Sequence, residues 1–298
     1  MSELEVRQLR YFVAVAEELH FGRAAERLGM AQPPLSRAIR ELERRLGVTL
    51  MERTTRRVTL TPAGETLLRD ARTALNAVTA AARRARLAGQ GEPRLRLAMK
   101  ADYDGGLLPQ ILAAYRREAA ALPVELVLGG RDGQEPALRD GRADLALLPS
   151  PFDDHGLDVE PLLTEPRLLA VAATDPLAAR TGLRLADLAG RVLPDGVPAD
   201  QSGIRGGLRH AIEPVVAAPP RPRDLAQIFS LVELGTIVWF PPVSIVRRHP
   251  RPDVAYLPVA DLAPLELVLA WPAESRSPAV AAFVRTATAI AATIAATA

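Results

Sequence analysis

The stretch AQPPLSRAIRELERRLG, residues 31–47, decides the fold of the N-terminal part of the chain. Its apolar residues recur at helical spacing and define one face of a predicted helix. That face consists of Leu35, Ile39, Leu42 and Leu46. Pro33 and Pro34 stand at the helix start, where backbone N–H groups have no partner within the helix and proline presets φ at about −65°. The two prolines therefore favour a stiff helix start rather than a helix break.

The open face of this helix start carries groups that can read base pairs. Gln32 can bond adenine, Ser36 can bond either kind of base pair, and Arg37 can fork onto guanine. The two prolines offer apolar surface to a thymine methyl group, and Arg40, one turn later, suits a phosphate. A short helix, a tight turn and then this helix are typical of a helix-turn-helix. A core-packing helix with a solvated polar face remains the alternative.

Residues 1–60 are predicted to form three short helices and a two-stranded wing. Gly22 is expected to cap the second helix. Apolar and polar residues alternate in part through VTLMERTTRRVTL, residues 48–60, on either side of a turn. Three arginines gather at the tip of this wing, where a minor groove or its phosphates would lie. They are Arg53, Arg56 and Arg57.

A long helix is predicted to follow, with Thr61 as its N-cap, Pro62 as its first residue, and an end near Leu87. It carries an apolar stripe that no folded neighbour in the sequence is placed to cover. The stripe consists of Leu67, Leu68, Ala71, Leu75, Val78 and Ala82. Such a seam suits a helix–helix dimer contact, and the alternative is a linker helix that lies on its own domain. The segment GQGEP, residues 89–93, then marks the clearest domain boundary.

Beyond this boundary, strands and helices alternate in an α/β pattern, for which mostly parallel sheets are expected. The predicted strands cover residues 94–99, 123–128, 143–148, 167–173, 191–193, 236–240 and 266–270. Helices are predicted at residues 106–119 and 134–140, and an amphipathic C-terminal helix through Val280 and Ile294 is expected to pack on a sheet. The length suffices for two small lobes, with a ligand at the carboxyl ends of the strands.

Charge is unevenly distributed along the chain. Residues 1–90 hold 16 arginines against 10 acidic residues, a net +6, whereas the whole chain carries +2. A basic N-terminal part followed by an acidic remainder indicates a polyanionic partner for the N-terminal part alone, although a charged run is usually just a solvated face. Lys100 is the only lysine, and the excess of arginine fits either coding bias or a need for bidentate contacts.

Composition and missing motifs exclude several classes of function. The absence of cysteine excludes disulfides, cysteine nucleophiles and thiolate metal sites, and four widely spaced histidines argue against a histidine metal site. No cofactor or metal is therefore expected. The sequence shows neither a signal peptide nor a membrane-spanning run, so a cytoplasmic location and no membrane partner are expected.

Two other classes of protein compete with a DNA-binding one. An enzyme is not expected, because the chain has no GxSxG, HExxH or Walker motif. The glycine-rich segments GGRDG and QSGIRGG lack the strand–loop–lysine context that would give them specificity. A solute receptor would explain two C-terminal lobes but not the basic N-terminal part, and it would require a signal peptide.

Six motifs occur in order within residues 4–68: RYFVAVAEE, AAERL, AQPPLSR, LE-x-x-LG, ER-x-x-R and LT-x-AG. This dense set resembles the N-terminal domain of LysR-type transcriptional regulators. The segments QPPLSR and LRYFVAVAE together resemble those of the family branch that controls aromatic-compound degradation. The C-terminal part resembles the effector domain of the family more loosely, through LLPQIL, LRDGRADLALLP and LVELGTIVWFPP.

The resemblance implies an α+β multidomain chain. It comprises a winged helix-turn-helix DNA-binding domain (1–60), a linker and dimerisation helix (61–91), and a periplasmic-binding-protein-like effector domain (92–298). In that domain, lobe I covers residues 92–163 and 265–298, and lobe II covers residues 164–264. The implied function is a transcriptional regulator of double-stranded promoter DNA, dimeric through the linker helix and commonly a homotetramer. A small organic effector would enter the interlobe cleft, with RNA polymerase as a further candidate partner.

Individual residues can be carried over from the family. Groove contacts fall on Gln32, Pro33, Ser36 and Arg37, and the wing contact falls on Arg56. Two positions depart from the family pattern. Ala31 replaces the frequent serine N-cap, and Met51 replaces a usual phenylalanine, a tolerable core substitution.

The resemblance also places the effector between two strand ends and a loop of the second lobe. These positions are Lys100, Ala101, Asp102, Tyr103, Gly130, Arg131, Gln201, Ser202, Phe229 and Ser230. Asp102 and Arg131 stand where related proteins often have hydroxyl groups. One interpretation is a ligand that pairs with both charges. The other is that Asp102 caps the following helix, or that it pairs with Arg131 and narrows the cleft. A negative Asp102 would repel a simple carboxylate.

Overall fold

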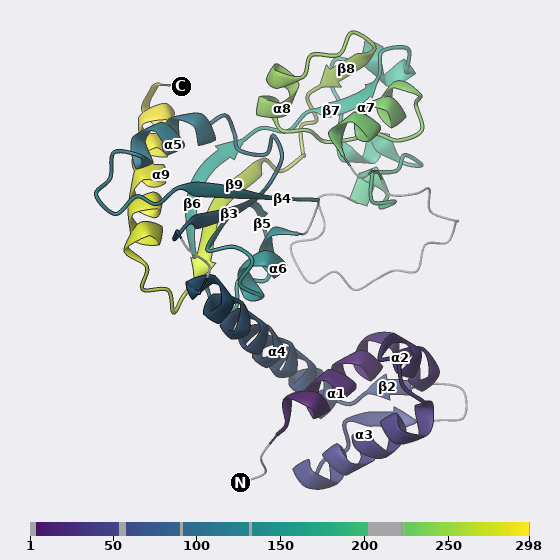
Figure 1. Cartoon of the computed structure of the whole chain (residues 1–298). Helices are drawn as coiled ribbons and strands as arrows, with labels where there is room; N and C mark the ends of the chain where they lie inside the picture. Colours follow the sequence, from purple (N-terminus) through teal and green to yellow (C-terminus); the bar gives the residue numbers. More distant parts are fainter. Residues whose placement is uncertain are drawn as a thin grey trace. The chain divides into compact units, whose positions relative to one another are not determined.

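The computed structural model describes residues 4–53, 58–89, 92–130, 133–201, 222 and 224–297 (Figure 1). The chain divides into two compact units, residues 1–91 with 139–141, and residues 92–138 with 142–298. Throughout the described ranges, every helix is too short or too polar to cross a bilayer.

The N-terminal unit begins with the predicted helices and hairpin (Figure 1). Its elements are α1 (Val6–Glu18), α2 (Phe21–Arg27), α3 (Gln32–Leu46), β1 (Met51–Arg53), β2 (Val58–Leu60) and α4 (Pro62–Ala88). The apolar face of α3 is confirmed, because Leu35, Ile39 and Leu42 are fully buried. The predicted start of α4 is also confirmed, since the Thr61 hydroxyl accepts a hydrogen bond from the Gly64 N–H at 3.1 Å.

Two expectations for this unit were wrong. His20, not Gly22, caps α2, because its Nδ1 accepts a hydrogen bond from the Arg23 N–H at 3.2 Å. The N-terminal part of the α4 stripe does have a folded neighbour: Ala71 is buried and Leu75 packs against the N-terminal core. Only the later part of the stripe is open, with Val78 41% exposed.

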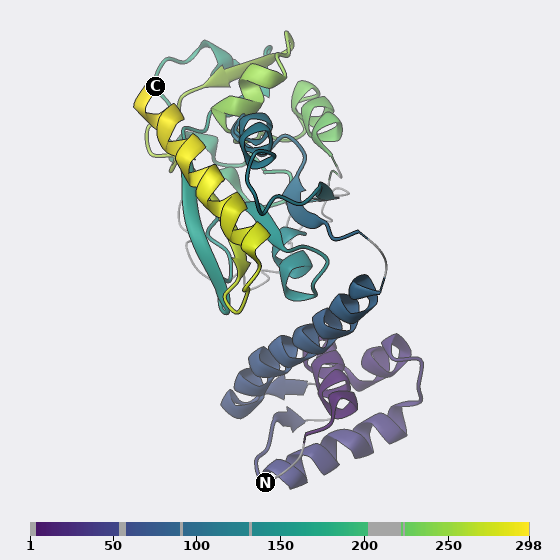
Figure 2. The ribbon, with the colours of Figure 1, turned by 60° about the vertical axis from the view of Figure 1, so that its left-hand side comes forward.

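A five-stranded sheet forms the first lobe of the C-terminal unit. Its strands are β3 (Leu95–Lys100), β4 (Val124–Gly129), β5 (Leu145–Ser150), β6 (Leu157–Glu165) and β9 (Leu265–Pro272), in the order β4-β3-β5-β9-β6. Helices α5 (Leu108–Tyr115) and α9 (Pro278–Thr297) share a core with one face, and α6 (Gln134–Arg139) packs on the other. Figure 2 shows α9 lying along the sheet, as predicted.

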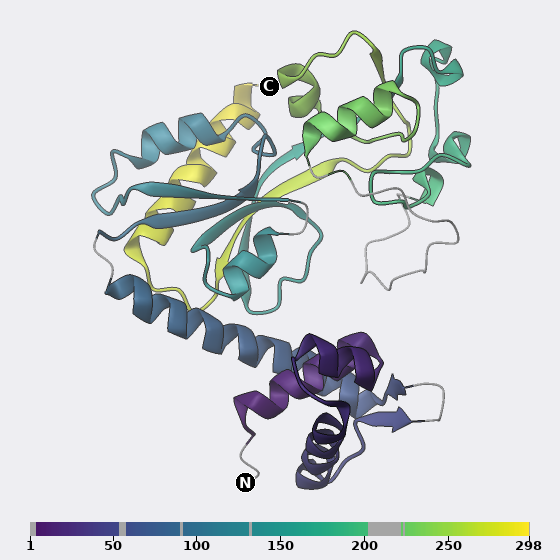
Figure 3. The same cartoon turned by 45° about the vertical axis from the view of Figure 1, so that its right-hand side comes forward.

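The expectation of mostly parallel sheets was wrong. Strand β3 is parallel to β4 and β5, but β9 is antiparallel to both β5 and β6. Strand β6 carries the chain out of the first lobe and β9 brings it back beside β6 (Figure 3). The sequence hides β6 because its register shifts between Pro161 and Leu163, which breaks the apolar alternation.

The second lobe is built around an antiparallel pair, β7 (Leu169–Ala172) and β8 (Val254–Leu257). It also contains α7 (Leu225–Glu233), α8 (Val243–Arg248) and the short turns η1 (Pro176–Ala179), η2 (Leu185–Leu188) and η3 (Ala199–Gln201). Strands predicted at residues 191–193 and 236–240 are single bridges instead, Val192 with Pro198 and Trp239 with Ala170. Prolines follow both segments and cannot donate to a ladder, which ends the pairing.

Helix α8 is attached to the first lobe at its N-terminal end. The Glu165 carboxylate, at the end of β6, accepts hydrogen bonds from the Ser244 N–H and the Ser244 hydroxyl, both at 2.9 Å. Glu165 is buried, so these two bonds satisfy a charge that water does not reach freely. The crossing point between the lobes is thereby fixed to the first turn of α8.

Candidate nucleic-acid interface and interlobe site

The start of α3 presents the predicted groove-reading residues together. Gln32, Pro33, Arg37 and Arg40 are exposed, and Pro34 and Ser36 are half-buried. Ala31 is the N-cap and supplies no side-chain hydrogen bond among the described residues, as the sequence predicts. The buried face below holds the helix in place, so this end is stiff, exposed and free of a side-chain cap.

The arginines of α3 differ in what they bind. Arg44 forms an ion pair with Glu41, with an N–O distance of 2.6 Å. Arg40 donates from Nε to the Ser36 carbonyl oxygen at 3.3 Å. Arg37, within the described ranges, has neither a hydrogen bond nor an ion pair. Its guanidinium fork is therefore available to an external acceptor.

Glu43 is a structural residue of this site that the sequence reasoning did not single out. Its Oε1 accepts hydrogen bonds from the backbone N–H groups of Leu50 at 3.0 Å and Met51 at 3.1 Å. Both donor residues are buried, so these bonds fix the first strand of the wing to α3. The available signal was the LE-x-x-LG motif, in which Glu43 is the acidic position.

The wing is described only in part. Its two strands pair in antiparallel fashion from Met51 opposite Leu60 to Arg53 opposite Val58. Arg56 and Arg57 lie outside the described residues. The backbone register therefore places Arg53 at the end of β1 nearest the wing tip.

At the interlobe site, two of the predicted positions meet at neighbouring strand ends. Lys100 pairs with Gly129 in the parallel ladder, so Gly130 follows directly beside it. The Lys100 ammonium lies 4.0 Å from the centroid of the Tyr103 ring, and Tyr103 packs against an apolar core of the second lobe. Arg131 and Ser202 lie outside the described residues, and Ala101 is exposed between its neighbours.

Asp102 has a partner that the sequence reasoning missed. One of its carboxylate oxygens accepts a hydrogen bond from Arg248 of α8 at 3.0 Å, and the other lies 3.2 Å from His249 Nε2. Arg248 also donates to Asp104 at 2.8 Å. Partial burial disfavours the Arg248 charge, but the bonds and charges of the two aspartates outweigh it and raise the Arg248 pKa. We call these four residues the Arg248 cluster.

The expectation that Asp102 caps the next helix was wrong. The N-cap position of α5 is Leu107, and the loop carboxylate that accepts a backbone N–H is Asp104, from Gly106 at 3.3 Å. Asp102 has a positive φ of 65°, a conformation that aspartate tolerates better than most residues. A local turn thus points Asp102 toward α8, and no local sequence pattern encodes a partner so distant along the chain.

Of the remaining predicted effector residues, Gln201 and Ser230 are not joined to the strand ends, whereas Phe229 belongs to the core against which Tyr103 packs, and its ring centroid lies 6.1 Å from that of His249. Phe229 is buried in the second lobe, where it makes an edge contact with Trp239 at 5.5 Å between ring centroids. Ser230 faces a separate cavity of about 470 Å³. Gln201 is exposed at the end of η3. Across the described residues, no hydrogen bond or ion pair links Gln201 or Ser230 to Lys100.

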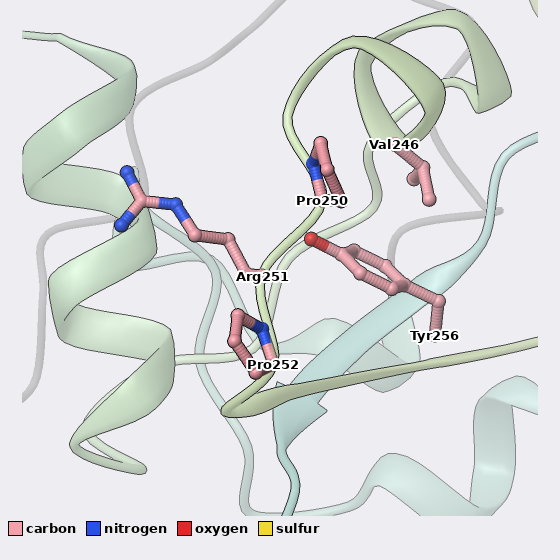
Figure 4. A pocket seen from close by; sticks show the side chains of 5 residues that line it. All are labelled: Val246, Pro250, Arg251, Pro252 and Tyr256. Atoms are coloured by element: carbon pink, nitrogen blue, oxygen red, sulfur yellow. The ribbon is translucent and has the colours of Figure 1, made fainter.

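A second cavity of about 440 Å³ lies beside α8. It is lined by Val246, Pro250, Arg251, Pro252 and Tyr256 (Figure 4). The Tyr256 hydroxyl is buried without a hydrogen-bond partner in the described structure, and burial raises its pKa. Arg251 extends away from Tyr256, and its ion pair with Glu233 measures 3.5 Å (Figure 4). None of the predicted effector residues that the structure describes lines this cavity.

Two family profiles match the chain. The "LysR substrate binding domain" matches residues 88–291, and the "Bacterial regulatory helix-turn-helix protein, lysR family" matches residues 6–65. The Hca operon transcriptional activator HcaR of Escherichia coli is 32% identical over 94% of this chain and 96% of its own.

Other relatives match over different lengths. The transcriptional regulator AlsR of Bacillus subtilis is 38% identical, but the alignment spans less than two thirds of either protein, 62% of each. The solved structure of CbnR, a LysR family transcriptional regulator, is 28% identical with a TM-score of 0.52, covering 97% of this chain and 99% of that one.

Proposed function

Since the chain belongs to the LysR family of bacterial transcriptional regulators, we propose that the start of α3 reads the major groove of promoter DNA. The observation that carries this assignment is the exposed, unpaired Arg37 on a described helix whose opposite face is fully buried. Gln32, Ser36 and Arg37 are assigned to base edges, because their donors and acceptors match those of adenine and guanine. Arg40 and the wing-tip arginines are assigned to phosphates. DNA binding requires a cytoplasmic location.

The salt dependence of DNA retention tests this assignment. If Arg40, Arg53, Arg56 and Arg57 of two protomers each neutralise one phosphate, log K should fall linearly with log salt, with a slope of about −7. Filter binding or fluorescence anisotropy over a salt series measures the slope. Arg40→Ala should reduce its magnitude by about 2 per dimer. A slope near zero in the unaltered protein would exclude this phosphate-anchored mode.

We propose that residues 1–60 bind DNA, residues 61–91 link and dimerise, and residues 92–298 bind a small organic effector between the lobes. The family matches support this assignment of separate roles to the segments. The effector would approach the ends of β3 and β4, because ligands of α/β lobes bind beyond the carboxyl ends of strands. Lys100, Tyr103 and Gly130 occupy that edge in this chain.

The oligomer is proposed to use two surfaces. The exposed part of α4 around Val78 offers a seam for a second α4. Strand β4 is an edge strand whose Leu126 and Leu128 are 42% and 61% exposed, and such an edge invites pairing with another chain. Two kinds of contact convert dimers into a homotetramer.

Leu128→Glu is expected to convert the tetramer to a dimer, because a buried carboxylate without a partner is unfavourable at an apolar interface. Light scattering after size-exclusion chromatography measures the mass. Glu125→Gln is the matched control on the same strand, since Glu125 is also exposed and should leave the mass unchanged. A Leu128→Glu protein that remains tetrameric would rule out the β4 edge as an interface.

A further inference from the structure

We propose that the interlobe site is built for a cationic effector, a small primary amine or guanidine, and that Arg248 is its internal competitor. This inference rests on the proposed effector role of the C-terminal unit and names the ligand class. It is carried by the Arg248 cluster, in which a cation of the second lobe occupies a pair of carboxylates of the first lobe.

The guanidinium of Arg248 makes the contacts with two carboxylates that the cationic group of a bound ligand would make. Its two terminal nitrogens each contact a different carboxylate, Asp102 at 3.0 Å and Asp104 at 2.8 Å. The distance to Asp104 is typical of a charge-assisted hydrogen bond, and the distance to Asp102 is slightly longer. Both aspartates lie on the loop after β3, beyond the carboxyl end of the strand, where ligands of α/β lobes bind. The guanidinium therefore lies between the two carboxylates, in the position that the cationic group of a ligand would take.

The burial of Asp104 decides the charge of the ligand. Its side chain is only 5% exposed, and its bonds are those to Arg248 and to the Gly106 N–H. A ligand that drew Arg248 away without replacing its charge would leave a buried carboxylate uncompensated, which is strongly unfavourable. A ligand carboxylate would add a further negative charge beside Asp102. An ammonium or guanidinium group restores the balance.

Arg248 has room to leave the cluster when another cation takes its place. Its side chain is already 34% exposed and it is the last residue of α8, so its guanidinium can turn into water. His249 adds a polar group for the incoming ligand. Its Nε2 is buried and forms no hydrogen bond in the described structure, although it lies 3.2 Å from Asp102.

The other charged group near this loop is consistent with a single cationic ligand. Lys100 is held over the Tyr103 ring, 4.0 Å from its centroid. Among these four described residues, the formal charges of Lys100 and Arg248 balance those of Asp102 and Asp104. Replacement of Arg248 by one ligand cation preserves that sum, whereas a carboxylate ligand does not.

Chemical rescue of Arg248→Ala in the full-length chain tests this inference. The substitution should lower Tm by about 5 °C, because it leaves two carboxylates without their cation. Agmatine, which carries a guanidinium and an amine, and benzylamine should restore most of the loss, whereas benzoate should not. Titration calorimetry should show agmatine binding to Arg248→Ala about tenfold more tightly than to the unaltered protein, if Arg248 occupies the site about nine tenths of the time.

Two matched variants make the test specific. Arg248→Ala combined with Asp104→Asn should show no rescue, because the carboxylate that selects the cation is gone. Arg247→Ala should neither lose stability nor respond to agmatine, since Arg247 is exposed on the same helix and forms no hydrogen bond or ion pair with described residues. Arg248→Lys serves if the alanine variant does not fold, and it should bind agmatine more tightly than the unaltered protein.

Three results would overturn the inference. They are an absence of rescue by either amine, equal rescue in the Asp104→Asn combination, and benzoate stabilisation that disappears in Arg248→Ala. The last result would assign Arg248 to anion binding. None of these outcomes affects operator binding, which the salt series measures separately, so the two proposals can fail independently.

Discussion

Replacing Arg37 with alanine is expected to lower affinity for the operator by about 5- to 150-fold, or about 1–3 kcal/mol, the usual value of a bidentate base contact. Arg37 is exposed and has no partner among the described residues, so its removal takes nothing from the folded state. Affinity for scrambled DNA should fall much less, because a base contact carries specificity rather than general attraction.

Competition between operator and scrambled DNA at fixed salt measures this effect. Arg44→Ala is the control on the same helix, since Arg44 is paired with Glu41, and it should leave the specificity ratio unchanged. Arg40→Ala should weaken both DNAs equally, as a phosphate contact does. If Arg37→Ala also weakens both equally, then Arg37 contacts phosphate and not a base.

Replacing Glu43 with alanine is expected to destabilise the N-terminal unit by about 2 kcal/mol and to loosen the wing. The change leaves the backbone N–H groups of Leu50 and Met51 without their acceptor, and an unsatisfied buried donor costs about 1–3 kcal/mol. In a small domain each kcal/mol corresponds to about 4–8 °C in Tm. DNA affinity should fall as well, since β1 would no longer be held against α3.

Hydrogen exchange of peptides covering residues 48–53 reports this loosening directly. Glu41→Ala is the matched control two residues earlier, because Glu41 pairs, among the described residues, only with the exposed Arg44, and such pairs contribute about 0–1 kcal/mol. Equal protection in the two variants would show that the Glu43 bonds do not stabilise the wing.

The N-terminal unit could be predicted because its signals are local. The spacing of Leu35, Ile39 and Leu42 encodes a buried face within one helix, and Thr61-Pro62 encodes the start of the next. The C-terminal unit depends on contacts between distant segments. A register shift at Pro161 hid β6, and this also hid the antiparallel part of the sheet.

The candidate sites also divide into one that depends on local sequence and one that depends on contacts between distant segments. The groove-reading residues follow one another on one helix end, so their sequence spacing nearly determines their positions. Asp102 and Arg248 are 146 positions apart, and their pairing arises from the approach of two lobes. The sequence offered Asp102 a ligand, a helix to cap or Arg131 as its partner, and it could not select Arg248 among many arginines.

Helix α8 is held at both ends by the first lobe, through Glu165 at its first turn and through Asp102 and Asp104 at its last. The Glu165 attachment lies where β6 leaves the first lobe. Strands β6 and β9 form the connection between the lobes, and the second lobe can rotate about them. Helix α8 is thus attached to the first lobe near Glu165 at its start and through Arg248 at its end. The guanidinium of Arg248 adds a second attachment between the lobes through two ion pairs, beside the Glu165 bonds and the packing of Tyr103 on the second lobe.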